Sequence, residues 1–315
     1  MRRLVDEGVK EITLLGQNVN SYCDDTVSSS LPEPLPSKES PMSKGFTTIY
    51  QPRSGGKRFA NLLDRVSQID SSVRFRFTSP HPKDFPDELL YLMRDRDNIC
   101  KQIHLPAQSG SSTVLERMRR GYTREAYLDL VAHIRSILPN VSLSSDFISG
   151  FCGESEQDHL ETVQLIEAVG FDMAYMFAYS MREKTMAHRR YADDVLEEIK
   201  QKRLAQVIDT FYKQLTEKVK LSIGRRELVL VEGPSKKSEL DLCGKTDGGR
   251  MLVFPKCEVA DPILGTRRTP QLGEYVEVEI VRCQGATPVG LPILFNSITG
   301  FAEMNDHDRC NLVSQ

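Results

Sequence analysis

The stretch VSLSSDFISGFCGESEQDHLETVQLIEAVG, residues 141–170, contains one complete strand-to-helix unit. Its first part, 141–151, is rich in β-branched and aromatic residues and reaches glycine, which is typical of a strand. Ser155 then stands where an N-cap is expected, and Gly170 stands where the helix should end. The stretch therefore predicts a strand, a glycine-containing loop and an α-helix.

The same order of strand and helix is repeated on both sides of this unit. Further strands are predicted at 11–16, 73–79, 101–106 and 172–180, and further helices at 59–69, 86–95 and 123–138. Repeated βα units favour a parallel sheet with right-handed crossovers. The first two thirds of the chain are therefore predicted to be an α/β domain.

Three other regions depart from this order. Residues 23–57 are rich in Ser, Pro and Gly and are predicted to form a mobile inserted loop. After a charged helix predicted over 193–221, short alternating strands separated by glycine-containing turns indicate an all-β barrel over 222–291. Residues 292–315 show no periodicity and are interpreted as a tail, so we divide the chain into domains at 1–221 and 222–291.

Composition restricts the functional classes. The 315 residues carry a formal net charge of -3, so any attraction to nucleic acid must come from local basic patches. No apolar run is long enough to span a membrane. The seven cysteines are scattered without a CxxC or CxxxCxxC arrangement, which predicts reduced thiols. The N-terminal sequence has a helix-like segment followed directly by a predicted strand, and it shows no targeting segment. We interpret this pattern as an upstream truncation.

Polar residues follow the predicted strands. In parallel βα folds, function gathers at the carboxyl ends of the strands, so we expect these residues to surround one ligand site. All five strands are followed in this way. The residues are Gln17, Asn18 and Asn20 after the first strand, Thr78, Ser79 and His81 after the second, His104, Gln108, Ser109 and Gly110 after the third, Asp146, Gly150, Gly153 and Glu154 in and after the fourth, and Tyr179, Ser180, Arg182 and Thr185 after the fifth.

Each motif also has a plainer interpretation. The loop HLPAQSGS, 104–111, lets backbone N–H groups approach a ligand, or it is an ordinary βα turn. Gly150 and Gly153 leave room for a flat ligand such as adenine, or they serve a strand exit with positive φ. YSMREKT, 179–185, is a carboxylate clamp or a solvated loop. The basic stretches RMRRGYTR, 117–124, and MAHRR, 186–190, contact phosphate or are solvated faces.

Five motifs in order carry a family resemblance: GQNVNSY (16–22), RFTSPHP (76–82), HLPAQSGSSTVLERMRRGYTREAY (104–127), SSDFISGFCGES (144–155) and FAYSMREKT (177–185). Together they resemble the MiaB-like radical S-adenosylmethionine (SAM) tRNA methylthiotransferase family, most of all its animal subgroup. The resemblance implies a TIM-like radical SAM βα barrel, here missing its first strand, followed by a small barrel that resembles an RNA-binding TRAM domain. Two departures are Cys152, where the family has proline, and Lys184, where it has glycine.

The resemblance also implies an activity, namely methylthiolation of an isopentenyl-adenosine next to the tRNA anticodon. In the family, a 4Fe-4S cluster on a CxxxCxxC loop cleaves SAM reductively, and a second cluster takes part in sulfur delivery. The implied SAM contacts are Gln17, Asn18, Gln108, Ser109, Gly110, Asp146, Gly150, Gly153, Glu154, Tyr179, Ser180 and Arg182. The implied partner is tRNA, and the implied compartment is the mitochondrion, with the cytoplasm as the alternative.

The sequence lacks the cluster-binding motif, so neither catalytic residues nor metal ligands are identified, and the chain alone is predicted to be inactive. Two functions stay open. The chain is part of a methylthiotransferase, or it is a non-catalytic isoform that binds tRNA or, through an open barrel edge, a protein. An unrelated parallel-sheet protein with a phosphate ligand is a third, weaker alternative.

Overall fold

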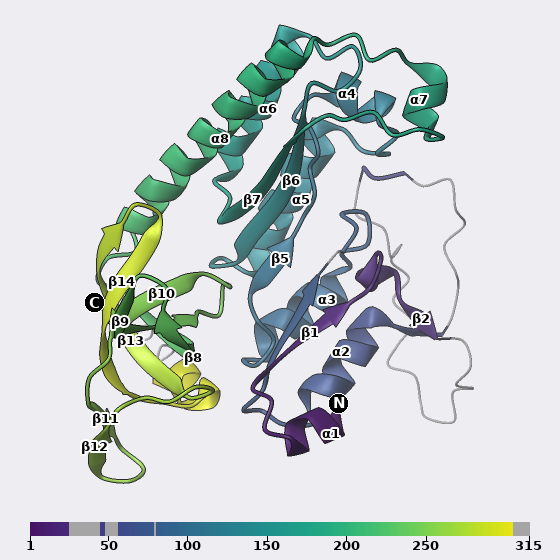
Figure 1. Cartoon of the computed structure of the whole chain (residues 1–315). Helices are drawn as coiled ribbons and strands as arrows, with labels where there is room; N and C mark the ends of the chain where they lie inside the picture. Colours follow the sequence, from purple (N-terminus) through teal and green to yellow (C-terminus); the bar gives the residue numbers. More distant parts are fainter. Residues whose placement is uncertain (25–44, 48–55, 79, 305–315) are drawn as a thin grey trace, which may run out of the picture.

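Five parallel strands form the frame of the first domain in a computed structural model, which describes residues 1–24, 45–47, 56–78 and 80–304. β1 pairs with β4, β5 pairs with β6 and β6 with β7, and a parallel bridge between Phe75 and Ile99 links the two sheets (Figure 1). The predicted strands all lie within two residues of these bounds: β1 (Glu11–Leu15), β4 (Arg74–Thr78), β5 (Gln102–His104), β6 (Ser142–Ser149) and β7 (Met173–Ala178).

Helices follow the strands as predicted and bury their apolar faces against them. Local signals define their ends: Thr123 Oγ1 accepts a hydrogen bond from Ala126 N, and Ser155 forms a capping box with Asp158. One contiguous core joins helices and sheet, which confirms the predicted α/β class. The helices are α2 (Phe59–Ser67), α3 (Asp87–Asp95), α4 (Ser112–Arg117), α5 (Arg124–Ile137) and α6 (Glu156–Val169).

Short elements complete the N-terminal region: α1 (Arg2–Asp6), the 3-10 helix η1 (Val19–Ser21), and the antiparallel pair β2 (Cys23–Asp24) and β3 (Lys57–Arg58). This pair joins the two ends of the predicted inserted loop. Most of that loop, 25–44 and 48–55, lies outside the described residues, so its mobility stays a prediction. Between these segments, Phe46 is buried with its ring centroid 4.9 Å from that of Tyr122.

The long helix α8 (Glu197–Lys220) follows the short α7 (Met186–Arg190) and extends from the region of α7 to the β-rich domain (Figure 1). Its buried side chains Val207, Phe211, Leu215 and Val219 recur every four residues, the spacing of an amphipathic helix. This stripe packs into the core of the α/β domain, and Cys283 and Ala286 of the second domain pack against the same core.

The second domain is an all-β barrel, as predicted. Its seven strands lie in the order β10-β9-β8-β13-β14-β11-β12, and an additional parallel contact between β10 and β14 closes the sheet. Val229, Leu252, Phe254, Val276 and Val278 fill its interior. The strands are β8 (Arg226–Ser235), β9 (Ser238–Lys245), β10 (Met251–Pro255), β11 (Val259–Asp261), β12 (Thr266–Arg268), β13 (Tyr275–Gln284) and β14 (Thr287–Phe295).

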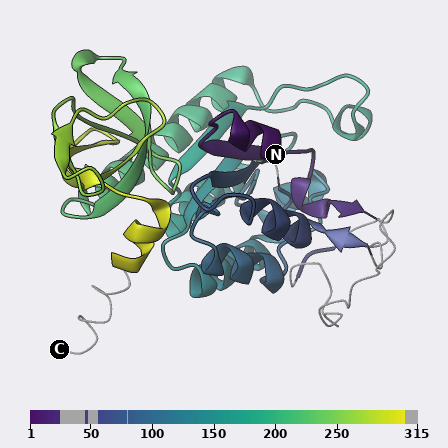
Figure 2. The ribbon, with the colours of Figure 1, turned by 90° about the horizontal axis from the view of Figure 1, so that it is seen from below.

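The predicted tail boundary at residue 292 is wrong. β14 continues to Phe295, and a helix over 298–304 follows it, seen in yellow beside the barrel in Figure 2. Ile298 of this helix packs on Leu228 and Tyr275. The two prolines of β14, Pro288 and Pro292, argue against a strand in the sequence, because proline cannot donate to a sheet ladder.

The β barrel packs against the amino ends of the parallel strands. Arg74 is 2% exposed, and its Nη atoms donate to Lys245 O at 2.8 Å and Leu228 O at 2.6 Å, while its guanidinium lies over the Tyr275 ring. Arg76 donates to the carbonyls of Thr246 and Asp247 at 2.8 and 2.7 Å. The β barrel therefore does not cover the opposite, carboxyl ends of the strands. Among the described residues, no helix is long and apolar enough to cross a bilayer.

Candidate functional site

A cavity of ≈ 500 Å³ lies at the carboxyl ends of the parallel strands. Segments after β1, β4 and β5, the loop between α4 and α5, and one residue of β6 converge on it. Four of the twelve implied SAM contacts line it: Gln17, Asn18, Gln108 and Asp146. The other lining residues are Leu15, Gly16, Pro80, His81, Pro82, His104, Pro106, Arg120 and Tyr122.

A polar group from β5 and β6 forms one wall. The two ring nitrogens of His104 lie 3.0 Å from Ser144 Oγ and 3.3 Å from Asp146 Oδ2. The ring of Tyr175 on β7 meets that of His104 edge-on, with centroids 6.1 Å apart. Because the parallel register places His104 beside Ser144, these side chains share one face of the sheet. The Asp146 side chain is 29% exposed, so its carboxylate can accept further hydrogen bonds.

Two residues of the cavity have a left-handed backbone that is uncommon for a side-chain-bearing residue. Asn18 has φ 56° and Gln108 has φ 69°. Gln108 is held there on both sides of its peptide, since its N–H donates to Asp146 O and its carbonyl accepts from Ile148 N. Left-handed residues that the surrounding structure holds in place are frequent in ligand sites.

The segment after β4 is fixed by Asn20, which is buried. The Asn20 side chain accepts from His81 N at 2.8 Å and donates to His81 O at 2.9 Å and to Asp84 O at 2.6 Å. Burial lowers the pKa of His81, and the neighbouring Lys83 cation lowers it further. His81 is therefore a neutral ring at pH 7, held against the cavity by the segment after β1.

Ser109 and Gly110 lie outside the cavity lining and face α6. Ser109 Oγ is 3.3 Å from Thr162 Oγ1, and Gly110 N donates to that same hydroxyl at 2.9 Å. A Cβ at Gly110 would lie 2.3 Å from Glu161 O. The small residues of this loop thus allow α6 to approach closely, which is the plainer of the two interpretations of HLPAQSGS.

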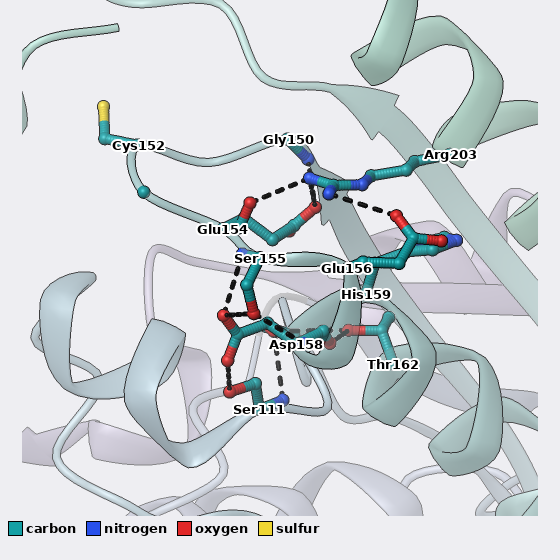
Figure 3. A network of polar contacts seen from close by, with 12 residues as sticks. Ser111, Gly150, Cys152, Glu154, Ser155, Glu156, Asp158, His159, Thr162 and Arg203 are labelled. Carbon is teal, nitrogen blue, oxygen red and sulfur yellow. Dashed lines mark hydrogen bonds and ion pairs between the residues drawn. The ribbon is translucent and has the colours of Figure 1, made fainter. Parts of the chain in front are cut away.

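Gly150 and Glu154 belong to a separate polar network after β6 (Figure 3), and Gly153 N nearby donates to Asp194 Oδ1 at 2.6 Å. The buried Glu154 carboxylate accepts from Gly150 N at 2.9 Å and from Arg203 Nη1 at 3.1 Å, and burial raises its pKa. A Cβ at Gly150 would lie 2.3 Å from Lys200 Cγ, and one at Gly153 would lie 1.7 Å from Arg117 Nη1. Both glycines therefore have an internal reason, the close packing of α8 and of Arg117, and their contact with adenine stays a prediction.

Tyr179, Ser180 and Arg182 also lie away from the cavity lining. The Tyr179 ring packs edge-on against Phe151, with centroids 4.8 Å apart, and lies below the Lys200 ammonium. Ser180 and Arg182 are exposed. All five strand ends were expected to meet at one cavity. The segments after β1, β4 and β5 and Asp146 within β6 do so, whereas the segments after β6 and β7 face α8 and solvent.

Sequence reasoning missed Arg120 and Tyr122 as part of the cavity wall. Tyr122 Oη donates to Pro106 O at 3.0 Å, and burial raises its pKa to about 12. The motif RGYTR contains both residues and was interpreted only as a basic stretch. Since the motif stands between two helices and not after a strand, the rule about strand ends could not find it.

Among the described residues, no group of three or more His, Cys, Asp or Glu side chains could hold a metal ion. The six cysteines in this part of the chain form no disulfide with one another: Cys23, Cys100, Cys152, Cys243, Cys257 and Cys283. Cys152 is buried, and its side chain points away from the Glu154 network (Figure 3). The described residues therefore do not fit an iron–sulfur cluster, whose usual ligands are several converging cysteine thiolates.

Comparisons with known proteins agree with this architecture. The Radical SAM superfamily model matches residues 1–166, and the TRAM domain model matches residues 220–287. The mitochondrial tRNA methylthiotransferase CDK5RAP1 of Homo sapiens is 55% identical over 287 residues, which are 89% of this chain and 46% of that protein. The CDK5RAP1-like protein of Oryza sativa subsp. japonica is 55% identical over 93% of this chain and 49% of its own length.

A bacterial relative is more distant. The tRNA-2-methylthio-N(6)-dimethylallyladenosine synthase of Chloroherpeton thalassium is 41% identical over 92% of this chain and 56% of its own length. The chain spans about half the length of these relatives.

Proposed function

Since the chain belongs to the radical SAM superfamily and has a TRAM domain after its βα barrel, we propose that it is the SAM-binding and RNA-binding part of a tRNA methylthiotransferase. The resemblance found in the motifs is confirmed by the comparisons. The observation that carries the proposal is the polar cavity at the carboxyl ends of the strands. The chain that contains this cavity is 55% identical, over most of its length, to the human protein named as a mitochondrial tRNA methylthiotransferase.

The cavity supports SAM as the ligand. Its volume lies within the ~300–1,000 Å³ of small-molecule sites, and its walls combine apolar residues with a few polar groups. We propose that Gln17, Asn18, Gln108 and Asp146 hold the polar groups of SAM directly. The remaining predicted contacts, Ser109, Gly110, Gly150, Gly153, Glu154, Tyr179, Ser180 and Arg182, would then act by supporting the cavity from α6 and α8 or by contacting a larger substrate.

The reaction proposed for the whole protein is methylthiolation of an isopentenyl-adenosine next to the anticodon. The name of the bacterial relative, a synthase of 2-methylthio-dimethylallyladenosine in tRNA, supports this substrate. The TRAM domain and the exposed basic segment with Arg182, Lys184, Arg189 and Arg190 support contact with RNA phosphates. The names of the human and rat relatives support a mitochondrial location.

An iron–sulfur cluster would supply the electron for cleavage of SAM, and the described cysteines do not offer the ligands that would hold it. This observation favours a second candidate function, a non-catalytic module that binds tRNA or a protein. One edge of β1 has no strand partner among the described residues, and it is the surface we propose for a protein.

Binding measurements on the 315-residue chain test the proposal. S-Adenosylhomocysteine, a stable relative of SAM, should bind to the wild-type chain in a calorimetric titration. Gln17→Ala should weaken this binding by about tenfold, since one hydrogen bond to a charged group contributes ~1.5–3 kcal/mol. The control is Gln164→Ala, at an exposed position of α6. Equal affinity of the two variants would contradict the assigned cavity.

Anaerobic reconstitution with iron and sulfide tests the predicted inactivity of this chain alone. We expect this chain alone to take up no stoichiometric iron and to show no methylthiolation of tRNA. A brown protein with stoichiometric iron and sulfide would reject the proposed inactivity.

A further inference from the structure

Arg120 is placed at the cavity by an unusual backbone. The residues on both sides of it, Arg119 (φ 59°) and Gly121 (φ 72°), are left-handed, and Arg119 has a side chain that disfavours this conformation. The two left-handed residues form the connection between α4 and α5, and Arg120 between them lines the cavity. A conformation of this kind persists only where the surrounding structure holds it.

The surrounding structure does hold this connection. Arg120 N donates to Leu115 O at 3.0 Å, and Gly121 O accepts from Thr47 N at 2.8 Å. Tyr122 Oη donates to the carbonyl of Pro106 in the loop after β5. These contacts fix the backbone at Arg120, and this backbone places its side chain in the lining of the cavity.

The Arg120 guanidinium has no hydrogen-bond or ion-pair partner within the described part of the chain, and its Nε atom is shielded from solvent without an acceptor. The neighbouring arginines of the same basic stretch differ in this respect. Arg117 donates to Cys152 O at 3.1 Å, and Arg124 donates to Glu161 O at 2.5 Å. A buried donor on a cation costs free energy until it meets an acceptor, so an acceptor from outside the described residues is indicated.

The other groups at the cavity leave this charge uncompensated. Asp146 faces His104, and it forms no ion pair with Arg120. The cation of Arg120 adds to burial and Lys83 in lowering the pKa of His81. Within the described part of the chain, the cavity thus carries the positive charge of Arg120 without a counter-charge, beside a neutral histidine.

We propose that Arg120 binds the anionic group of the ligand in this cavity, a carboxylate or a phosphodiester. The inference rests on the proposed function, which supplies one anion of each kind: the carboxylate of SAM and the backbone of the RNA. The planar guanidinium donates two parallel hydrogen bonds to either group, which an ammonium cannot do.

The test compares Arg120→Gln, Arg120→Lys and the control Arg119→Gln in the full 315-residue chain. Arg119 is exposed and adjacent, so its substitution removes the same charge outside the cavity lining. The probes are S-adenosylhomocysteine, methylthioadenosine, which is a related nucleoside without a carboxylate, an anticodon stem-loop RNA, and inorganic phosphate. Circular dichroism checks that all variants are folded.

Two results support the proposal and distinguish the source of the anion. If Arg120 binds the carboxylate, Arg120→Gln lowers the affinity for S-adenosylhomocysteine by roughly ten- to a hundredfold and leaves the affinity for methylthioadenosine unchanged. Arg120→Lys should have an intermediate affinity for S-adenosylhomocysteine. If Arg120 binds the phosphodiester, Arg120→Gln lowers the affinity for the stem-loop RNA. It also reduces the slope of log affinity against log salt concentration by about 1. Arg119→Gln should reproduce neither change.

Equal affinities of Arg120→Gln and Arg119→Gln for every probe would overturn the proposal. If the wild-type chain binds neither nucleoside nor RNA, the proposed function fails, and the phosphate titration still decides the inference. Thermal stabilisation by phosphate that is lost in Arg120→Gln and kept in Arg119→Gln supports an anion site, whereas equal stabilisation rejects it.

Discussion

The two ends of the parallel strands use arginine differently. At the amino end, the Arg74 guanidinium is buried, donates to two carbonyls of the β barrel and lies over Tyr275. At the carboxyl end, Arg120 lines a cavity and has no partner among the described residues. The comparison teaches that the arginine at the amino end forms hydrogen bonds between the two domains, whereas the arginine at the carboxyl end can donate to a ligand. Substitutions at the amino end should therefore change stability, and those at the carboxyl end should change binding.

The largest effect is expected for Arg74→Ala. The change leaves Lys245 O and Leu228 O buried without a donor and removes the cation from Tyr275, so we expect a loss of about 3–5 kcal/mol in the free energy of unfolding. Urea unfolding followed by circular dichroism measures it. The control Arg94→Ala removes an exposed ion pair with Asp95 and should cost less than about 0.5 kcal/mol. Similar midpoints for the two variants would show that the contact between the domains is not maintained by Arg74.

Gly110→Ala should have the next largest effect, although the loop belongs to the carboxyl end. The new Cβ would lie 2.3 Å from Glu161 O, so α6 must shift, at a cost of about 1–3 kcal/mol. The matched control is Gly170→Ala, which meets no atom within 4 Å and suffers only from its φ of 61°, at about 1 kcal/mol. Thermal unfolding of both variants measures the difference. The explanation of Gly110 by packing on α6 fails if Gly170→Ala is the more damaging change.

The amino end should also give the protein a pH dependence. Burial raises the pKa of Glu227 to about 7 from its ordinary value of 4.5, and the charge of Asp247 adds to the shift. Between these two values the folded chain retains a proton that the unfolded chain releases, so stability decreases as the pH rises from 4.5 to 7. The loss is complete above pH 7 and amounts to at most about 3 kcal/mol.

Glu227→Gln should flatten this part of the stability curve, measured by urea unfolding at several pH values. The exposed Glu239→Gln controls for the removal of one carboxylate. An unchanged slope in Glu227→Gln would assign the pH dependence to other groups.

The smallest change in stability is expected for Asp146→Asn. Its carboxylate is 29% exposed and has one long contact to His104, so unfolding should change by less than about 0.5 kcal/mol. Binding of S-adenosylhomocysteine should weaken by about tenfold if the proposed site is correct. A loss of stability comparable with that of Arg74→Ala would erase the contrast between the two ends.

Local sequence signals predicted the elements well. The strand at 141–151 and the helix that starts at Ser155 are correct because their determinants, β-branched residues, a capping box and a terminal glycine, act within a few residues. The end of β14 was missed because its prolines contradict the local rule. The plainer interpretation of the glycines after β6 is confirmed, since Gly150 and Gly153 have φ of 79° and 68°. The sequence does not say that Lys200 and Arg117 pack against them.

The amino-acid sequence by itself determined the α/β barrel, the second β domain, the family and four residues of the cavity, since these follow from periodicity, end signals and ordered motifs. Only the tertiary structure decided that Gly150 and Gly153 face Lys200 and Arg117, and that Arg120 remains without a partner in the described chain. The physical reason is that a hydrogen-bond partner is chosen by distance in space. Arg74 and Arg120 are the same residue type, and only folding placed two buried carbonyls of the second domain beside Arg74.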